Sequence, residues 1–393
     1  MRSIYGQASQ VVVWLGEGWD GSDMALEFLA SLAGNETLHL DPLLEPSISV
    51  NGLSLSSVEL RGHLVRLFGF PWWNRTWTVR ELVLSQRLVY QCSKSSITGE
   101  TMSMAVANFW SHRTRCCAGC TIWDSEQIST ELGLTVHDAF TQPARLDFIT
   151  KARGPSYSIL AAIATFCGRE VTDPRDKVYG LLGLGTGVYT DLVEPDYTLS
   201  PEEVCQAVVI KSTERTGTLE FLSHLFEPRN PKLPSYIPNW TAKGFGGVML
   251  ENRLSDLKLF NTALDILTDF KLIASREAKI SGTIFDVIIT TSFRALRSAE
   301  NYNAEFFNDI HRLARIEDSS EEQYGSTKCS RWVALWHSLC GGIEPVFQDS
   351  NIYSRRLKGS TDLSRYFKWK EFSRLVLKDR RNCRSMICPP FVG

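Results

Sequence analysis

The stretch Val11-Val12-Val13-Trp14-Leu15-Gly16 decides the fold class of this chain. An unbroken apolar run that ends at a glycine is typical of a β-strand buried on both faces, as in a parallel α/β sheet. A helix is predicted directly after it over residues 23–33, because Ser22 can cap its N-terminus and Gly34 stands where helices commonly end. A strand, a short loop and a buried helix form half of a βαβ unit. We therefore predict an α/β fold with parallel strands and helices for residues 1–110.

The rest of the chain divides where its composition changes. Residues 111–155 mix cysteine, glycine, threonine and charged residues without a clear period, which we interpret as a connector or variable insert. Residues 156–240 are predicted to be mainly helical. Their clearest helix start is at Ser200, where Ser200 and Glu203 have the spacing of a capping box. Residues 241–393 are predicted to form an α+β region that ends in a basic tail.

Charge and hydropathy exclude several classes of protein. With 42 Lys and Arg against 44 Asp and Glu in 393 residues, nothing global favours nucleic acid or an acidic membrane. The tail over residues 351–393 is basic but lacks the regular aromatic residues of single-strand binders, so we predict no nucleic-acid partner. The longest stretch without a charged residue, 154–168, is shorter than the ~20 residues needed to span a bilayer. We therefore expect a cytoplasmic protein without a membrane span.

The cysteines raise the question of a metal or redox site. His112, Cys116, Cys117 and Cys120 lie close together in the sequence, but zinc sites commonly use two separated ligand pairs, and no second Cys/His pair follows at finger-like spacing. The Cys117 to Cys120 spacing is that of a redox motif, yet it lacks the βαβ context that such motifs need. The sequence predicts no metal site and no bound cofactor, with the ten cysteines as free thiols.

Four tryptophans, Trp14, Trp72, Trp73 and Trp77, are predicted to be core aromatics. Trp73, Trp77 and Glu81 share one face if residues 73–84 form a helix.

Four segments together resemble the fungal heterokaryon incompatibility (HET) domain proteins, in the family's order and rough spacing. They are residues 1–16 (MRSIYGQA followed by VVVWLG), 71–81 (PWWNRTWTVRE), 173–184 with 195–197 (DPRDKVYGLLGL and PDY), and 233–240 (LPSYIPNW). The resemblance covers residues 1–240 well. It implies a role in fungal nonself recognition and programmed cell death.

The departures from the family pattern are also informative. Family members usually carry two further strand motifs before the isoleucine-tyrosine segment, so the resemblance implies a member truncated at its N-terminus, with residues 1–110 as the C-terminal half of a HET domain. Arg80 stands where the family usually has glutamine.

The resemblance also implies a candidate catalytic site. The HET domain is remotely similar to the Toll/interleukin-receptor (TIR) fold, and in TIR enzymes a tryptophan and a nearby glutamate on a helix serve NAD cleavage. Trp77 and Glu81, one helical turn apart, match that pairing, with Glu81 as the catalytic carboxylate and Trp77 in support. A carboxylate beside the ribose would stabilise the oxocarbenium character that develops as the nicotinamide–ribose bond breaks.

Three alternatives remain open at this point. The chain is an effector that signals through protein partners or self-association, an enzyme that takes NAD as its substrate, or a fragment without function. The charged residues of the third segment, Asp173, Arg175 and Asp176, are interpreted as a helix cap, a salt bridge and a favourable interaction with a helix dipole.

Overall fold

The computed structural model forms two compact units. Unit 1 comprises residues 1–254 and 263–281, and unit 2 comprises residues 255–262 and 282–393. The structure describes residues 2–118, 120, 135–155, 157–225, 230–241, 267–274, 276–281, 311–312, 330–339, 343–348 and 351–356.

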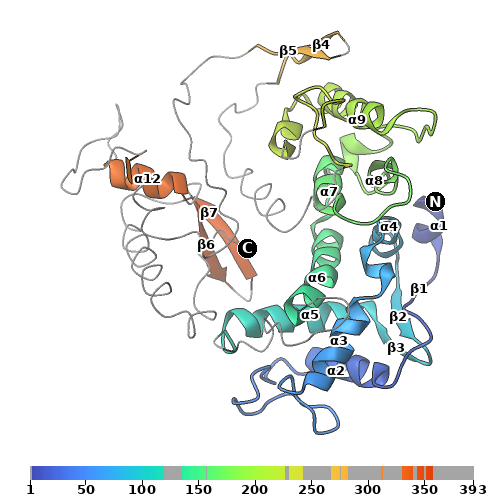
Figure 1. Ribbon diagram of the computed structural model, residues 1–393, viewed down its shortest axis with the longest axis vertical. Helices are drawn as coiled ribbons and strands as arrows, with labels where there is room; N and C mark the ends of the chain where they lie inside the picture. The colour runs from blue at the N-terminus through green and yellow to red at the C-terminus, as the bar shows by residue number, and fades with distance from the viewer. Residues whose placement is uncertain are drawn as a thin grey trace. The chain divides into compact units, whose positions relative to one another are not determined.

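Unit 1 is built around a small mixed sheet with the strand order β1-β2-β3 (Figure 1). Strand β1 (Val11–Trp14) pairs in parallel with β2 (Leu88–Cys92), and β2 pairs with β3 (Ser95–Thr98) in the antiparallel direction. The register places Val13 opposite Tyr90. The predicted combination of helices with parallel strands is confirmed, since β1 and β2 form a parallel pair and helices make up much of the described chain.

Strand β1 differs from its prediction because only one of its faces is buried. Val11 and Val13 lie in the interior, whereas Val12 is 50% and Trp14 48% exposed. Successive side chains of a strand point to opposite sides, and the side that carries Val12 and Trp14 is uncovered among the described residues. The prediction of a doubly buried strand, with Trp14 in the core, is therefore wrong.

Helices make up most of the remaining described part of unit 1. They are α1 (Arg2–Gln7), α2 (Ser22–Gly34), α3 (Val58–Phe68), η1 (Pro71–Asn74), α4 (Trp77–Val83), α5 (Gly99–Thr114), α6 (Val136–Ala152), α7 (Ile159–Phe166), α8 (Asp176–Tyr179), η3 (Gly187–Tyr189), α9 (Pro201–Thr216) and η4 (Glu220–His224). A short hairpin, β4 (Lys271–Ala274) with β5 (Glu277–Lys279), completes it. The predicted capping box is present at α9, where the Ser200 hydroxyl accepts from the Glu203 amide at 3.2 Å.

Helix α6 occupies a segment that the sequence analysis interpreted as a connector. Thr135 caps it through a capping box with Asp138, a local signal that the mixed composition obscured. Its residues Val136, Phe140 and Ile149 are buried, and the Phe140 ring stacks on Phe109 with a centroid distance of 3.9 Å. This segment is thus part of the core.

The tryptophan-rich segment is not one continuous helix. It forms the short turn η1, an extended residue at Arg75, and then α4. Trp73 therefore does not share a helical face with Trp77. Trp73 is instead fully buried, donates from Nε1 to the Leu67 carbonyl at 3.0 Å, and stacks on Tyr90.

Unit 2 contains helix α12 (Arg331–Leu339) and the antiparallel hairpin of β6 (Ile343–Gln348) and β7 (Asn351–Arg356). Most of the predicted α+β region over residues 241–393, with its basic tail, lies outside the described residues; Lys279 ends β5 and Arg356 ends β7. Among the described residues, no helix has the length and apolar character needed to cross a membrane.

The neighbours Val12 and Val13 give a matched test of the half-buried strand. Val13→Ala is expected to lower the free energy of unfolding by about 2 kcal/mol, because it removes buried methyl groups and leaves a cavity. Val12→Ala should change it by less than about 0.5 kcal/mol, because that side chain is exposed. Urea denaturation of both variants measures the difference. Equal losses would show that both faces of β1 are packed.

Candidate functional site

The motif segments at residues 71–81 and 173–184 lie next to each other in the structure. Residues 74–76 run alongside Glu170: the Thr76 amide donates to the Glu170 carbonyl at 3.1 Å, and the Glu170 amide donates to the Asn74 carbonyl at 2.6 Å. This backbone pairing places the start of α4 against the turn that leads into α8. Residues almost a hundred positions apart thus form one polar interface.

The carboxylate of Asp176 is the centre of this interface. The Trp77 indole donates from Nε1 to Asp176 Oδ2 at 3.1 Å, and the Tyr197 hydroxyl donates to Asp176 Oδ1 at 2.7 Å. Burial and the bond to Asp176 raise the pKa of Tyr197 to about 12. One side chain from the third motif therefore joins α4 to the Pro-Asp-Tyr segment.

A second bridge lies beside it. The Tyr179 side chain is buried, and its hydroxyl donates to the Asp196 carbonyl at 2.8 Å while it accepts from the Asp196 amide at 3.1 Å. The guanidinium of Arg80 lies 3.5 Å from the Tyr179 carbonyl and over the Trp77 ring. Arginine at this position therefore reaches from α4 to α8.

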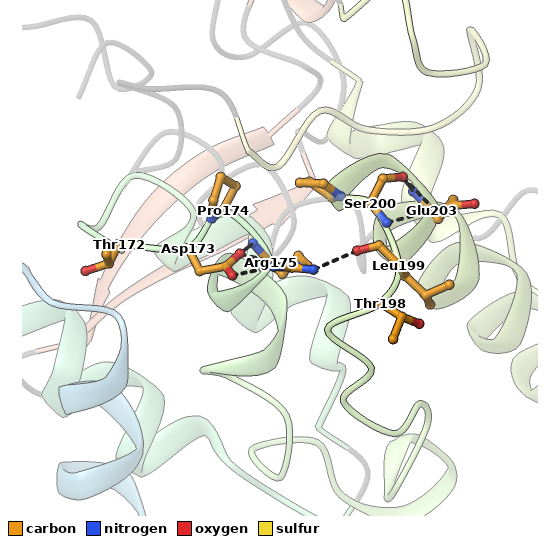
Figure 2. A pocket seen from close by; sticks show the side chains of 9 residues that line it. Thr172, Asp173, Pro174, Arg175, Thr198, Leu199, Ser200 and Glu203 are labelled. Atoms are coloured by element: carbon orange, nitrogen blue, oxygen red, sulfur yellow. Dashed lines mark hydrogen bonds and ion pairs between the residues drawn. The ribbon is translucent and has the colours of Figure 1, made fainter.

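Asp173 and Arg175 form the wall of a shallow depression of about 610 Å³ (Figure 2). Arg175 donates to both carboxylate oxygens of Asp173, from Nε at 2.9 Å and from Nη2 at 2.7 Å, and from Nη1 to the carbonyls of Tyr197 and Leu199. The hydrogen bonds from Arg175 lower the pKa of Asp173. The predicted salt bridge is present, but the predicted cap is not, because α8 begins at Asp176 without a side-chain cap. Asp173 instead accepts from the Arg175 amide at 3.0 Å in the turn before the helix.

Lys177 is a residue whose role the sequence did not indicate. Its side chain is buried, and Nζ donates to the backbone carbonyls of Cys167 and Arg169. Burial lowers the pKa of this ammonium group. These bonds fasten α8 to the C-terminal end of α7, where helix carbonyls lack intrahelical partners.

Glu81 lies on the same helix as Trp77 but in a different environment. Trp72 donates from its Nε1 to Glu81 Oε2 at 3.2 Å. The Tyr5 hydroxyl of α1 hydrogen-bonds the same carboxylate. Burial, together with the charge of Glu81, raises the pKa of the Tyr5 phenol. The partners of Glu81 are therefore Trp72 and Tyr5, while Trp77 is bonded to Asp176.

Glu81 and Trp77 lie one turn apart on α4 but have different hydrogen-bond partners. Glu81 is half-buried between two aromatic side chains, and Trp77 belongs to the interface around Asp176. The depression beside Arg175 is lined by neither residue, and the same holds for a smaller one of about 170 Å³ beside Arg169. Trp72 and Tyr5 lie next to Glu81, although the sequence did not indicate them as residues of the site.

The chain is similar to "Heterokaryon incompatibility protein 6, OR allele" of Neurospora crassa, with 26% identical residues over 92% of this chain. The chain spans 60% of the length of that relative. No protein-family model matches the chain, and no solved structure matches it with significance. The predicted relationship to the fungal heterokaryon incompatibility proteins is confirmed by this similarity. The likeness to the TIR fold stays a prediction.

The raised phenol pKa values predict a loss of stability at alkaline pH. Burial first, and a neighbouring carboxylate second, raise the pKa of Tyr197 and of Tyr189 from 10.0 to about 12. Between these values the folded chain holds more protons than the unfolded chain, so the free energy of unfolding falls as the pH rises from about 10 to 12. Tyr197→Phe and Asp176→Asn should each make this fall shallower, as measured by denaturation midpoints across the range.

Tyr189→Phe is the matched control, because Tyr189 titrates over the same range but bonds to Glu220 instead of Asp176. Its effect should add to those of Tyr197→Phe and of Asp176→Asn, because Tyr189 has no bond to Asp176. The effects of Tyr197→Phe and Asp176→Asn should not add to each other, because both act through the same phenol. An unchanged slope in Tyr197→Phe would contradict the contribution of this phenol.

Proposed function

We propose that the chain acts in heterokaryon incompatibility, as an effector module in fungal nonself recognition and programmed cell death. The observation that carries this proposal is the similarity over 92% of the chain to a protein named for heterokaryon incompatibility. The interface around Asp176 supports it, because the motif segments that resemble the family are held together there by specific hydrogen bonds.

The surface of unit 1 supports signalling by association. Strand β1 stands at the edge of its sheet among the described strands, and its exposed face carries Val12 and Trp14. Edge strands with apolar side chains are templates for pairing with another chain, and exposed apolar patches commonly mark protein contacts. We propose that the effector signals through this edge, to a second copy or to a protein partner.

Inducible expression in a filamentous fungus tests this function. Wild-type chain is expected to arrest growth and kill cells. The double variant Val12→Lys with Trp14→Glu should abolish the response, because two charges on the exposed face of β1 block apolar contact. Leu43→Glu, at a side chain that is 89% exposed elsewhere in unit 1, is the control and should leave the response intact.

Two outcomes would contradict the proposal. Wild-type chain that is expressed, folded and harmless in compatible and incompatible strains alike would remove the effector role. A double variant that kills as fast as wild-type chain would leave the effector role but remove association through β1. The melting temperature of each purified variant shows whether a lost response reflects unfolding.

A second candidate function, cleavage of NAD, is favoured by the environment of Glu81. A half-buried carboxylate beside Trp72 and Tyr5 offers negative charge and flat aromatic surfaces at one place. In such a reaction the nicotinamide leaves with the electron pair of the bond to ribose, and water supplies the new bond. Glu81 would stabilise the positive charge on the ribose.

NAD consumption by the full chain tests the second candidate. Glu81→Gln keeps the shape of the side chain and removes its charge, so it should lower the rate by about 10²-fold or more. Glu27→Gln, at an exposed residue of α2, is the matched control and should retain the full rate. Equal consumption by wild type and Glu81→Gln would show that Glu81 has no catalytic role.

A further inference from the structure

Four side chains with metal-binding atoms converge at the C-terminal end of α5. They are His39, His112, Cys116 and Cys117, and their ligand atoms all lie within 4.8 Å of one another. Three of them belong to the cluster seen in the sequence. His39 comes from the loop between α2 and α3, more than seventy positions earlier, and supplies the separated ligand that the sequence analysis did not find.

The distances between these atoms lie around those of a small tetrahedral site, from 3.0 Å to within 4.8 Å. The two sulfurs of Cys116 and Cys117 are 3.7 Å apart. Zinc bonds of about 2.3 Å to sulfur and 2.0–2.1 Å to nitrogen give tetrahedral edges of about 3.8 Å between sulfurs and about 3.5 Å between sulfur and nitrogen. Nδ1 of His112 is 3.0 Å from the Cys116 sulfur, and Nδ1 of His39 is 3.8 Å from the Cys117 sulfur.

The backbone fixes the ligands in place. The His39 amide donates to the Pro46 carbonyl at 2.8 Å, and its carbonyl accepts from the Ile48 amide at 2.9 Å. The Cys117 amide donates to the His112 carbonyl at 2.9 Å, which turns the chain back toward the helix end. His39 and Cys117 are thus each held by hydrogen bonds of their own segment.

The next layer of contacts also suits a metal centre. The backbone amides of Leu40 and Asp41 hydrogen-bond the Cys117 sulfur, and the backbone carbonyl of Glu36 hydrogen-bonds the His112 ring. Metal-bound histidines commonly donate their other ring nitrogen to a carbonyl, which orients the ring. The loop that provides His39 therefore provides this outer layer as well.

We propose that His39, His112, Cys116 and Cys117 bind one Zn²⁺. Two imidazole nitrogens and two thiolate sulfurs are a ligand set that selects zinc, and four protein ligands complete its tetrahedron, as in structural sites. On binding, the two thiols release their protons to solvent. The ion ties the loop between α2 and α3 to the end of α5, and its role is to stabilise unit 1.

Zinc content of the purified full chain tests the site. In the presence of a non-thiol reductant, wild-type chain should retain about one Zn²⁺ per chain after dialysis. His39→Asn and the double variant Cys116→Ser with Cys117→Ser should lose it. His63→Asn, at a histidine of α3 outside the cluster, should keep it. Chelation should lower the melting temperature of wild type and leave that of the double variant unchanged.

Cobalt substitution keeps the proposal testable if a variant fails to fold. Wild-type chain loaded with Co²⁺ should show thiolate-to-metal charge transfer and the intense visible bands of tetrahedral cobalt. Absence of zinc and of these bands would overturn the site. A Cys116–Cys117 disulfide that persists under the reductant, or full zinc retention by His39→Asn, would overturn it equally.

Discussion

The contact between α4, α8 and the Pro-Asp-Tyr segment depends on one carboxylate between two aromatic donors. Asp176 accepts from the Trp77 indole through one oxygen and from the Tyr197 hydroxyl through the other. Hydrogen bonds to an ionised acceptor are roughly twice as strong as neutral ones, and directional donors fix position as well as energy. The bond therefore sets how α4 lies against α8, and the backbone pairing of residues 74–76 with Glu170 aligns the same two segments.

This constraint explains why the charged motif residues are poorly suited to catalysis. Both oxygens of Asp173 are bonded to Arg175, and both oxygens of Asp176 are bonded to aromatic side chains. Lys177 is buried against two carbonyls. The hydrogen bonds of each of these groups join segments of the fold. Glu81 is likewise half-buried and bonded to the aromatic side chains of Trp72 and Tyr5, so its catalytic role stays a prediction.

Local signals in the sequence predicted much of the fold and little of the site. The capping box at Ser200 was predictable because its cause lies within a few residues. The one-sided burial of β1 was not predictable from the sequence, because it depends on what covers each face of the sheet. A run made only of apolar residues gives no sign of which side chains are exposed. The break in the helix at Arg75 was hidden in the same way, since pairing with Glu170 overrides the helical period.

The hydrogen-bond partners of the site residues could not be predicted from the sequence spacing, for a related reason. Trp77 and Glu81 are one turn apart, yet the indole bonds to a residue 99 positions away and the glutamate to one 9 positions before it. Helical spacing places side chains on a face and leaves open which donor meets which acceptor, because that choice is made by the segments packed on the helix. The same reasoning applies to His39, which no local pattern connects to His112. In this chain the chemistry of each motif is completed by residues from distant segments, so a motif predicts where a site lies better than which atoms form it.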